Sequence, residues 1–353
     1  MRSFDYTYNP FQFKPLAVLP KPLTDEWRKW IAENKMLGAS DQSLLQTLVM
    51  NGIDPGLARQ ELEAVVAHPY FQAGRNIGMS VRKLESHLNI KEKLRELSPI
   101  QTQIDRRSNL SRQEFLEAYY ITGTPVIITD VMQNWQAMSA WNPDYLREQF
   151  GDLEVEIQAN RNADPRYEVN SEHHKHTVKM RQYVDMVVNG GETNDYYMVA
   201  NNHQVNNQVL QAVFDHIEMF PAYLDPSLAE GRAFFWFGPK GTITPLHHDP
   251  TNLMMAQVVG TKRWKMISPL QTHLMYNHTG VFSEVNAENP DYQKYPLYQR
   301  VRVFEFDLHP GEVIFMPVGW WHHVRSLDIC ISMSFTNFVF PNAYEWDYPQ
   351  IKR

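Results

Sequence analysis

Apolar residues in the first hundred positions recur at the spacing of amphipathic helices. The apolar groups at residues 27–31 and 44–49 are each followed by a glycine, which is a common helix stop. Residues 54–66 begin with Asp-Pro, a typical N-cap and first helical position. A further helix is expected between about residues 79 and 97. We therefore expect an N-terminal α-helical region over residues 1–98, either a small bundle that packs on the rest of the chain or a partner-binding module.

Short runs of β-branched and aromatic residues replace this pattern after Pro99, with Gly, Pro, Asn and Asp between them. The runs expected to form strands are GTPVIITDV, DYYMVANN, RAFFWFGP, NLMMAQVVG, KRWKMISP, EVIFMPVG and CISMSFTNFVF. One helix is expected within the series, over residues 177–190. Many short strands with long connections are typical of a sandwich or a double-sheet jelly roll. The expected fold is mainly β, with a jelly-roll domain over residues 99–345 and a short C-terminal tail over residues 346–353.

Composition narrows the class of protein. The chain has 353 residues and is 43% hydrophobic, which is ordinary for a globular protein with a sizeable core. It has 33 basic and 40 acidic residues and no basic cluster, so a nucleic-acid surface has no support. Cys330 is the only cysteine, which fits a reducing compartment. Because no apolar run is like a signal-peptide core or a membrane span, we expect a soluble, cytoplasmic protein without a membrane partner.

Two segments that contain histidine suggest a metal site. Residues two apart in an extended strand share a face, so His247 and Asp249 can point at one ion while His248 points away. The later segment MPVGWWHHVRS offers His322 or His323, and the spacing does not choose between them. Two histidines and one carboxylate form the facial triad of non-haem Fe(II) oxygenases. The alternative is that these are ordinary polar residues at strand ends.

Three ordered segments resemble the JmjC, or cupin-like, 2-oxoglutarate oxygenases. They are TPLHHDPTNLMMAQVVGTKRW (244–264), SEVNAENPDYQKYP (283–296) and PGEVIFMPVGWWHHVRSLD (310–328). The resemblance runs from about Asp105 to about Phe340 and implies a double-stranded β-helix, the jelly-roll fold of this family. Within the family the chain is most similar to the small hydroxylase branch, which includes the asparaginyl hydroxylase of hypoxia-inducible factor, an arginyl hydroxylase and a tRNA wybutosine hydroxylase.

By position, the resemblance implies ligands for iron and for a cosubstrate. Fe(II) would be held by His247, Asp249 and His322, and 2-oxoglutarate by Lys262, Thr244, Tyr197 and Ser334. Lys262 would bind the far carboxylate of 2-oxoglutarate, whereas the residues alone favour a solvated lysine in a turn. Tyr196 is an alternative to Tyr197. Whether Ser334 or Asn252 contacts the cosubstrate is left open, because Asn252 lies one place before the asparagine of several relatives.

The reaction implied by the resemblance is hydroxylation of an unactivated C–H bond by O2, with conversion of 2-oxoglutarate to succinate and CO2. We expect the substrate to be a protein or peptide side chain, with a small molecule as a second option. Val281 and Phe282 stand where the asparaginyl hydroxylase has Arg-Gln, which argues against asparaginyl specificity.

Three other functions are compatible with the same residues. Lysine demethylation and tRNA-base hydroxylation are enzymatic alternatives within the family. A metal-binding cupin scaffold without oxygenase activity belongs to a different class, and Lys262 and Thr244 would have no purpose in it. The oligomeric state is left open, with a homodimer as one option.

Overall fold

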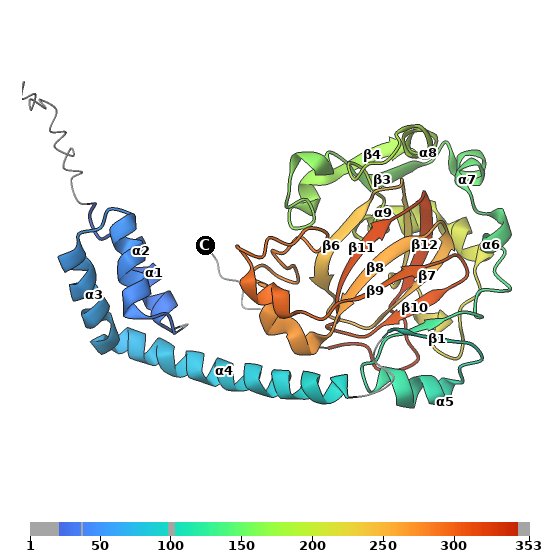
Figure 1. The fold of residues 1–353 in the computed structure, drawn as a ribbon. Helices are drawn as coiled ribbons and strands as arrows, with labels where there is room; N and C mark the ends of the chain where they lie inside the picture. The colour runs from blue at the N-terminus through green and yellow to red at the C-terminus, as the bar shows by residue number, and fades with distance from the viewer. Residues whose placement is uncertain (1–20, 37, 98–102, 345–353) are drawn as a thin grey trace, which may run out of the picture. The chain divides into compact units, whose positions relative to one another are not determined.

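The chain forms two compact units, residues 1–87 and 88–353, in a computed structural model (Figure 1). The structure describes residues 21–36, 38–97 and 103–344. The expected domain boundary at residue 98 and the expected tail at 346–353 lie outside these described residues, so both limits stay predictions. Within the described ranges, every helix is too short or too polar to cross a membrane.

The first unit is helical, as predicted. Its helices are α1 (Asp25–Met36), α2 (Asp41–Met50), α3 (Pro55–Ala67) and α4 (Pro69–Glu96), the last of which continues into the second unit. The side chains of Ser40 and Asp54 cap α2 and α3 by accepting hydrogen bonds from backbone N–H groups of the first turn. The small apolar core of this unit includes Leu48. α4 begins well before the expected start near residue 79. Gly74 and Gly78 weaken the helical pattern of the sequence there, but they do not end the helix.

Two β-sheets build the second unit. The six-stranded sheet has the strand order β1-β2-β10-β7-β12-β5, the four-stranded sheet has the order β6-β11-β8-β9, and β3 pairs with β4 separately. The strands are β1 (Asp105–Arg107), β2 (Val126–Ile128), β3 (Glu154–Gln158), β4 (Lys175–Lys179), β5 (Ala233–Gly238), β6 (Ile243–His248), β7 (Leu253–Val259), β8 (Lys262–Ile267), β9 (Phe304–Leu308), β10 (Val313–Met316), β11 (Trp321–Ser326) and β12 (Cys330–Phe335). Neighbouring strands come from distant parts of the sequence, as in a jelly roll, so the expected mainly β fold with N-terminal helices is confirmed.

Short helices connect these strands. The α-helices are α5 (Arg112–Phe115), α6 (Ala137–Ala140), α7 (Pro143–Phe150), α8 (Met180–Asn189) and α9 (His203–Val209), and a π-helical turn, η2 (Leu116–Tyr120), follows α5. The 3-10 turns are η3 (Arg161–Ala163), η4 (Ser171–His174), η5 (Ala200–Asn202), η6 (Gln211–His216), η7 (Pro226–Leu228), η8 (Pro269–Leu274) and η9 (Pro296–Arg300).

Two expected elements differ from the structure. The helix expected over residues 177–190 is α8, and the three residues before it belong instead to β4, where pairing with β3 fixes them in an extended conformation. The strand expected in DYYMVANN is reduced to isolated bridges, from Tyr197 to Gln158 and from Met198 to Phe237. Both differences depend on pairing with segments distant in the sequence, which local sequence patterns do not encode.

The strand β7 separates two apolar cores. Its residues Met254, Ala256 and Val258 pack in the core that also contains side chains of α7 and α8. Met255 faces the interior between the two sheets, with apolar side chains of β8, β9 and β10. Because both faces of β7 are buried, its sequence is an almost continuous apolar run instead of an alternating one.

Phe335 on β12 provides a test of the core on the α7 and α8 side. It is fully buried, and its ring contacts those of Trp135 and Phe220 at centroid distances of 6.2 and 6.1 Å. We expect Phe335→Ala to lower the free energy of unfolding by about 3–5 kcal/mol, because the cavity adds to the lost burial. Urea unfolding would measure the change. Ile121→Ala is the control, since Ile121 is 71% exposed and its loss should cost less than about 0.5 kcal/mol. Equal losses in both variants would contradict the prediction.

Candidate metal centre and cosubstrate pocket

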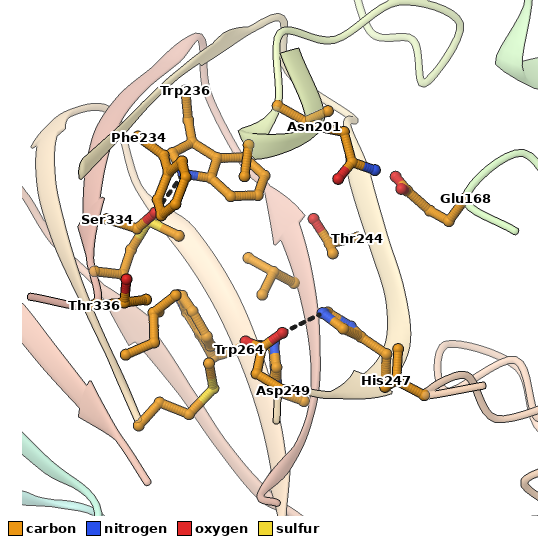
Figure 2. Close-up of a pocket in the computed structure, with 18 of the residues that line it drawn as sticks. Glu168, Asn201, Phe234, Trp236, Thr244, His247, Asp249, Trp264, Ser334 and Thr336 are labelled. Carbon is orange, nitrogen blue, oxygen red and sulfur yellow. Dashed lines mark hydrogen bonds and ion pairs between the residues drawn. The ribbon is translucent and has the colours of Figure 1, made fainter. Parts of the chain in front are cut away.

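Three side chains of the jelly roll converge on one point. His247 lies near the end of β6, Asp249 directly follows that strand, and His322 lies on β11 opposite His247 in the strand register. Nε2 of His247 lies 3.8 Å from Oδ1 of Asp249 (Figure 2). Nε2 of His322 lies 3.8 Å from Oδ2 of the same carboxylate. One ligand atom from each residue lies within 4.8 Å of those from the other two. This is a spacing at which three donors can share one metal ion.

Backbone carbonyls orient both imidazoles. Nδ1 of His247 lies 2.8 Å from the carbonyl oxygen of Pro245, and Nδ1 of His322 lies 3.0 Å from that of Trp320. A carbonyl can only accept, so each Nδ1 carries the proton and each Nε2 presents its lone pair toward Asp249. This tautomer is the one that a metal needs, and the two histidines with one carboxylate fit the donor set of Fe(II).

Burial shifts the pKa of two of the three groups, Asp249 and His322. Asp249 lies deep in the protein, where burial raises the pKa of its carboxyl, although 28% of the side chain opens toward the pocket. Burial and the nearby His247 hold the pKa of His322 well below its ordinary value. The imidazole of His322 is therefore neutral at pH 7, as a ligand must be. A divalent cation would supply the positive charge that the buried carboxylate lacks among the described residues.

The neighbouring histidines face other surroundings. The ring of His248 packs edge-on against Trp321 at 4.7 Å, and Nε2 of His323 lies 3.9 Å from Oε1 of Glu288. Burial lowers the pKa of each histidine to about 4. The fold thus brings His322, and not His323, to the convergence point, a choice that sequence spacing left open.

The convergence point lies in a cavity of about 420 Å³. All seven residues expected to hold iron or 2-oxoglutarate line it, namely Tyr197, Thr244, His247, Asp249, Lys262, His322 and Ser334. They come from β6, β8, β11 and β12, from the segment after β6, and from the segment between α8 and η5.

Lys262 is a buried cation. Alternate residues of β8 face inward, so the side chains of Lys262 and Trp264 are buried while Arg263 is exposed and paired with Asp307. The ammonium of Lys262 donates to the hydroxyl of Tyr197 at 3.1 Å. Across residues 21–36, 38–97 and 103–344, no carboxylate forms an ion pair with it. A buried ammonium without an anionic partner is costly, so this end of the cavity is suited to a carboxylate ligand.

Hydrogen bonds distinguish between the remaining candidate ligands of the cosubstrate. The hydroxyl of Tyr196 donates to the carbonyl oxygen of Met186 at 2.6 Å, so Tyr197 alone of the tyrosine pair faces Lys262. The hydroxyl of Ser334 accepts a hydrogen bond from Trp236 Nε1 at 2.8 Å and keeps its own proton for a ligand (Figure 2).

Asn252 has a structural contact instead. Its side-chain oxygen accepts from the backbone N–H of Val318 at 2.8 Å, and its amide nitrogen donates to the hydroxyl of Tyr344 at 3.0 Å. It does not line the cavity.

Several residues that line the cavity were not found from the sequence. Trp264 could have been found, because it lies two residues after Lys262 on a strand and so shares its face. Its ring stacks on that of His322 at a centroid distance of 5.9 Å. Glu168 and Asn201 also line the cavity, but they belong to irregular segments, where no periodicity shows which way a side chain points.

Comparison with known proteins gives the family. Residues 111–338 match the cupin-like domain. The chain belongs to the cupin-like domain family. It is 31% identical over 239 residues to lysine-specific demethylase JMJ30 of Arabidopsis thaliana, covering 66% of this chain and 54% of the relative. It is 33% identical over 236 residues to lysine-specific demethylase 8 of Danio rerio, covering 64% and 56%. It is also 29% identical over 254 residues to JmjC domain-containing protein D of Dictyostelium discoideum, covering 65% and 54%.

These relatives confirm the resemblance to JmjC proteins at the level of the family. JmjC proteins use Fe(II) and 2-oxoglutarate, and the group of His247, Asp249 and His322 fits such a centre. Two of the three names refer to lysine demethylases, and none of the three supports the narrower expectation of the asparaginyl hydroxylase branch. The chain spans about half the length of these relatives.

The adjacent histidines of β11 allow a matched test of the metal centre. We expect excess Mn(II) to raise the melting temperature of the wild type and of His323→Gln, but not that of His322→Gln, because only His322 directs a nitrogen at Asp249. A metal present at about 100 times its dissociation constant stabilises the folded state by roughly 2.7 kcal/mol. Thermal unfolding with and without the metal measures the shift. Loss of the shift in His323→Gln alone would show that the ligand is wrongly assigned.

Proposed function

We propose that the chain is an Fe(II)- and 2-oxoglutarate-dependent oxygenase that hydroxylates an unactivated C–H bond, with a protein or peptide side chain as substrate. One observation carries the proposal: the group of two histidines and a carboxylate and the buried ammonium of Lys262 face the same cavity. A metal scaffold would need only the first of these features. A dicarboxylate that chelates the metal at one end needs both, because its far carboxylate then meets the lysine.

Each residue has a defined task in this proposal. His247, Asp249 and His322 hold Fe(II), which with 2-oxoglutarate and O2 supplies the oxidation of the substrate C–H bond. Lys262 binds the far carboxylate of 2-oxoglutarate. Because the hydroxyl of Tyr197 accepts from Lys262, its own proton is free to reach the same carboxylate.

Two more hydroxyls complete the proposed cosubstrate site. Thr244 lies on β6 three residues before His247 and donates to the far carboxylate, while Ser334 donates from β12. The remaining wall is largely apolar, including Leu253 and Met255, and keeps water from the reacting atoms. No side chain has to act as a general acid or base.

The proposed organisation follows the sequence. Residues 1–98 form an N-terminal helical region, residues 99–345 the oxygenase domain, and residues 346–353 a short tail. The proposal of a protein substrate is supported by the relatives named as lysine-specific demethylases.

Lysine demethylation is the second candidate function, and those same names favour it. The chemistry begins identically. Hydroxylation of an N-methyl group gives N–CH2OH, which breaks its C–N bond to release formaldehyde and the N–H amine. Hydroxylase and demethylase therefore need the same iron and 2-oxoglutarate ligands, and they differ only in which C–H bond the substrate presents. The alternative of tRNA-base hydroxylation has no comparable support, because no basic tract accompanies the domain.

Lys262 and Lys265 provide a matched pair for testing the cosubstrate site. Both lie on β8, but Lys265 points outward, where it donates to the carbonyl oxygen of Ala287 and pairs with Glu305. We expect Lys262→Ala to raise the KM for 2-oxoglutarate on the order of a hundredfold, equivalent to about 2.8 kcal/mol of lost binding. Lys265→Ala should leave it within about twofold. The measurement is succinate formation with Fe(II). No turnover by the wild type, with no binding of 2-oxoglutarate, would favour the inactive scaffold.

The two candidate reactions give different products from one peptide screen. Peptides carrying unmodified lysine or arginine would be incubated with the full chain, Fe(II), 2-oxoglutarate and O2, beside the same peptides bearing N-methyl groups. A hydroxylase adds one oxygen atom to an unmethylated peptide. A demethylase removes a methyl group and releases formaldehyde in equal amount. Mass spectrometry of the peptide and a formaldehyde assay together decide between them, and Asp249→Ala is the control that should abolish either product.

A further inference from the structure

A second carboxylate lies in the wall of the cavity, away from the metal ligands. Glu168 comes from the irregular segment between η3 and η4 and lines the same cavity as His247 and Lys262. Figure 2 shows its carboxylate and the side-chain amide of Asn201 with their polar ends toward one another, on the side of the pocket where Thr244 lies. Glu168 and Asp249 are the two acidic residues that line this cavity.

A buried arginine fixes the position of Glu168. Nη2 of Arg161 lies 2.9 Å from Oε1 of Glu168 and 2.7 Å from the carbonyl oxygen of Ile243. The guanidinium of Arg161 also lies over the ring of Tyr167, 4.2 Å from its centroid, and the hydroxyl of Tyr167 donates to the same carbonyl of Ile243 at 3.2 Å. Ile243 is the first residue of β6, the strand that carries Thr244 and His247. The carboxylate is thus anchored to the strand of the metal group.

The contact between Arg161 and Glu168 leaves half of the carboxylate available. Arginine and a carboxylate often form two parallel hydrogen bonds, but here one nitrogen contacts one oxygen. In the described part of the chain, no hydrogen bond or ion pair reaches Oε2 of Glu168. The side chain is only 11% exposed. Because Glu168 lines the cavity, this oxygen is an acceptor that a ligand in the cavity can reach.

The surroundings favour a cationic donor. In the proposed function, Asp249 binds the metal and Lys262 binds the cosubstrate, so Glu168 is the carboxylate of the cavity that a substrate can reach, with one oxygen paired to Arg161 and the other available. The rings of Phe234 and Trp236 also line the cavity and offer faces on which a cation can rest. A carboxylate only accepts hydrogen bonds, and it binds charged N–H donors more strongly than neutral ones.

We propose that Glu168 binds the cationic end of the substrate side chain, a guanidinium or an ammonium, and that Arg161 acts as the positioning residue that holds Glu168 in place. The proposal rests on the proposed function, because it takes the metal group as the other end of the substrate site. It makes this oxygenase selective for arginine-like or lysine-like side chains through a residue outside the iron and cosubstrate ligands.

Binding of isosteric probes tests the proposal on the full chain. N-acetyl-arginine methylamide would be compared with its citrulline counterpart, which has nearly the same shape without the charge, and N-acetyl-lysine methylamide with the norleucine compound. Dissociation constants would be measured by NMR on the metal-free protein and again with Zn(II) and N-oxalylglycine bound. We expect the wild type to favour at least one cation over its neutral partner on the order of tenfold to a hundredfold.

Two variants separate the role of Glu168 from a general effect of charge. Glu168→Gln keeps the size of the side chain and should reduce the preference to nearly one. Glu172→Gln is the control, because Glu172 lies in the next turn with a side chain 76% exposed, where it pairs with Lys175 and does not line the cavity. It should keep the full preference.

The outcomes are distinguishable. Preference for the arginine probe identifies a guanidinium site, and preference for the lysine probe an ammonium site. A wild-type preference near one, an unchanged preference in Glu168→Gln, or no saturable binding of either cation would overturn the proposal. Failure of the proposed function is recorded separately as the absence of succinate formation, since probe binding to the metal-free protein does not depend on turnover.

Discussion

The antiparallel pairing of β6 with β11 is the constraint on which the metal centre depends. It places His322 opposite His247, although the two are 75 positions apart in the sequence and no local pattern relates them. Asp249, one residue beyond the end of β6, then lies within reach of both imidazoles. The backbone supplies the rest of the geometry, because the carbonyl groups of Pro245 and Trp320 fix which imidazole nitrogen carries the proton.

The two-residue period of β8 extends this geometry to the far end of the cavity. It turns Lys262 and Trp264 inward together, so that one strand supplies both a cation and an aromatic wall. The apolar strand β7 beside the cavity is explained by its position between two cores. The polar side chains that line the cavity come mostly from the other strands β6, β8, β11 and β12. The proposed chemistry depends on this separation of the polar and apolar sides of the cavity.

Sequence patterns predicted the parts of the structure that depend on periodicity. They predicted the helical N-terminal region, the mainly β domain, and a shared face for His247 and Asp249. Only the family resemblance selected His322. Spacing alone could not choose between His322 and His323, because the register of β11 against β6 shifts between His322 and Val324. Such an irregularity changes which side chains share a face, and it depends on the partner strand. Glu168 was missed for a related reason, since its direction is set by Arg161 and by a carbonyl on β6. The roles assigned to the site residues stay predictions.

The duplicated Trp-Trp-His-His at the start of β11 has a consequence for how the strand is aligned. A slip of one position would bring His323 into the place of His322 and Trp321 into that of Trp320. It would also put His322 in the place of Trp321 and Val324 in that of His323, so only half of the four places would keep their residue type. The preceding turn adds a further constraint on this alignment. There, Asn252 holds the N–H of Val318 and the carbonyl of Asp249 holds the N–H of Gly319. Asn252 does not line the cavity, yet its side-chain amide helps to fix which imidazole becomes the ligand.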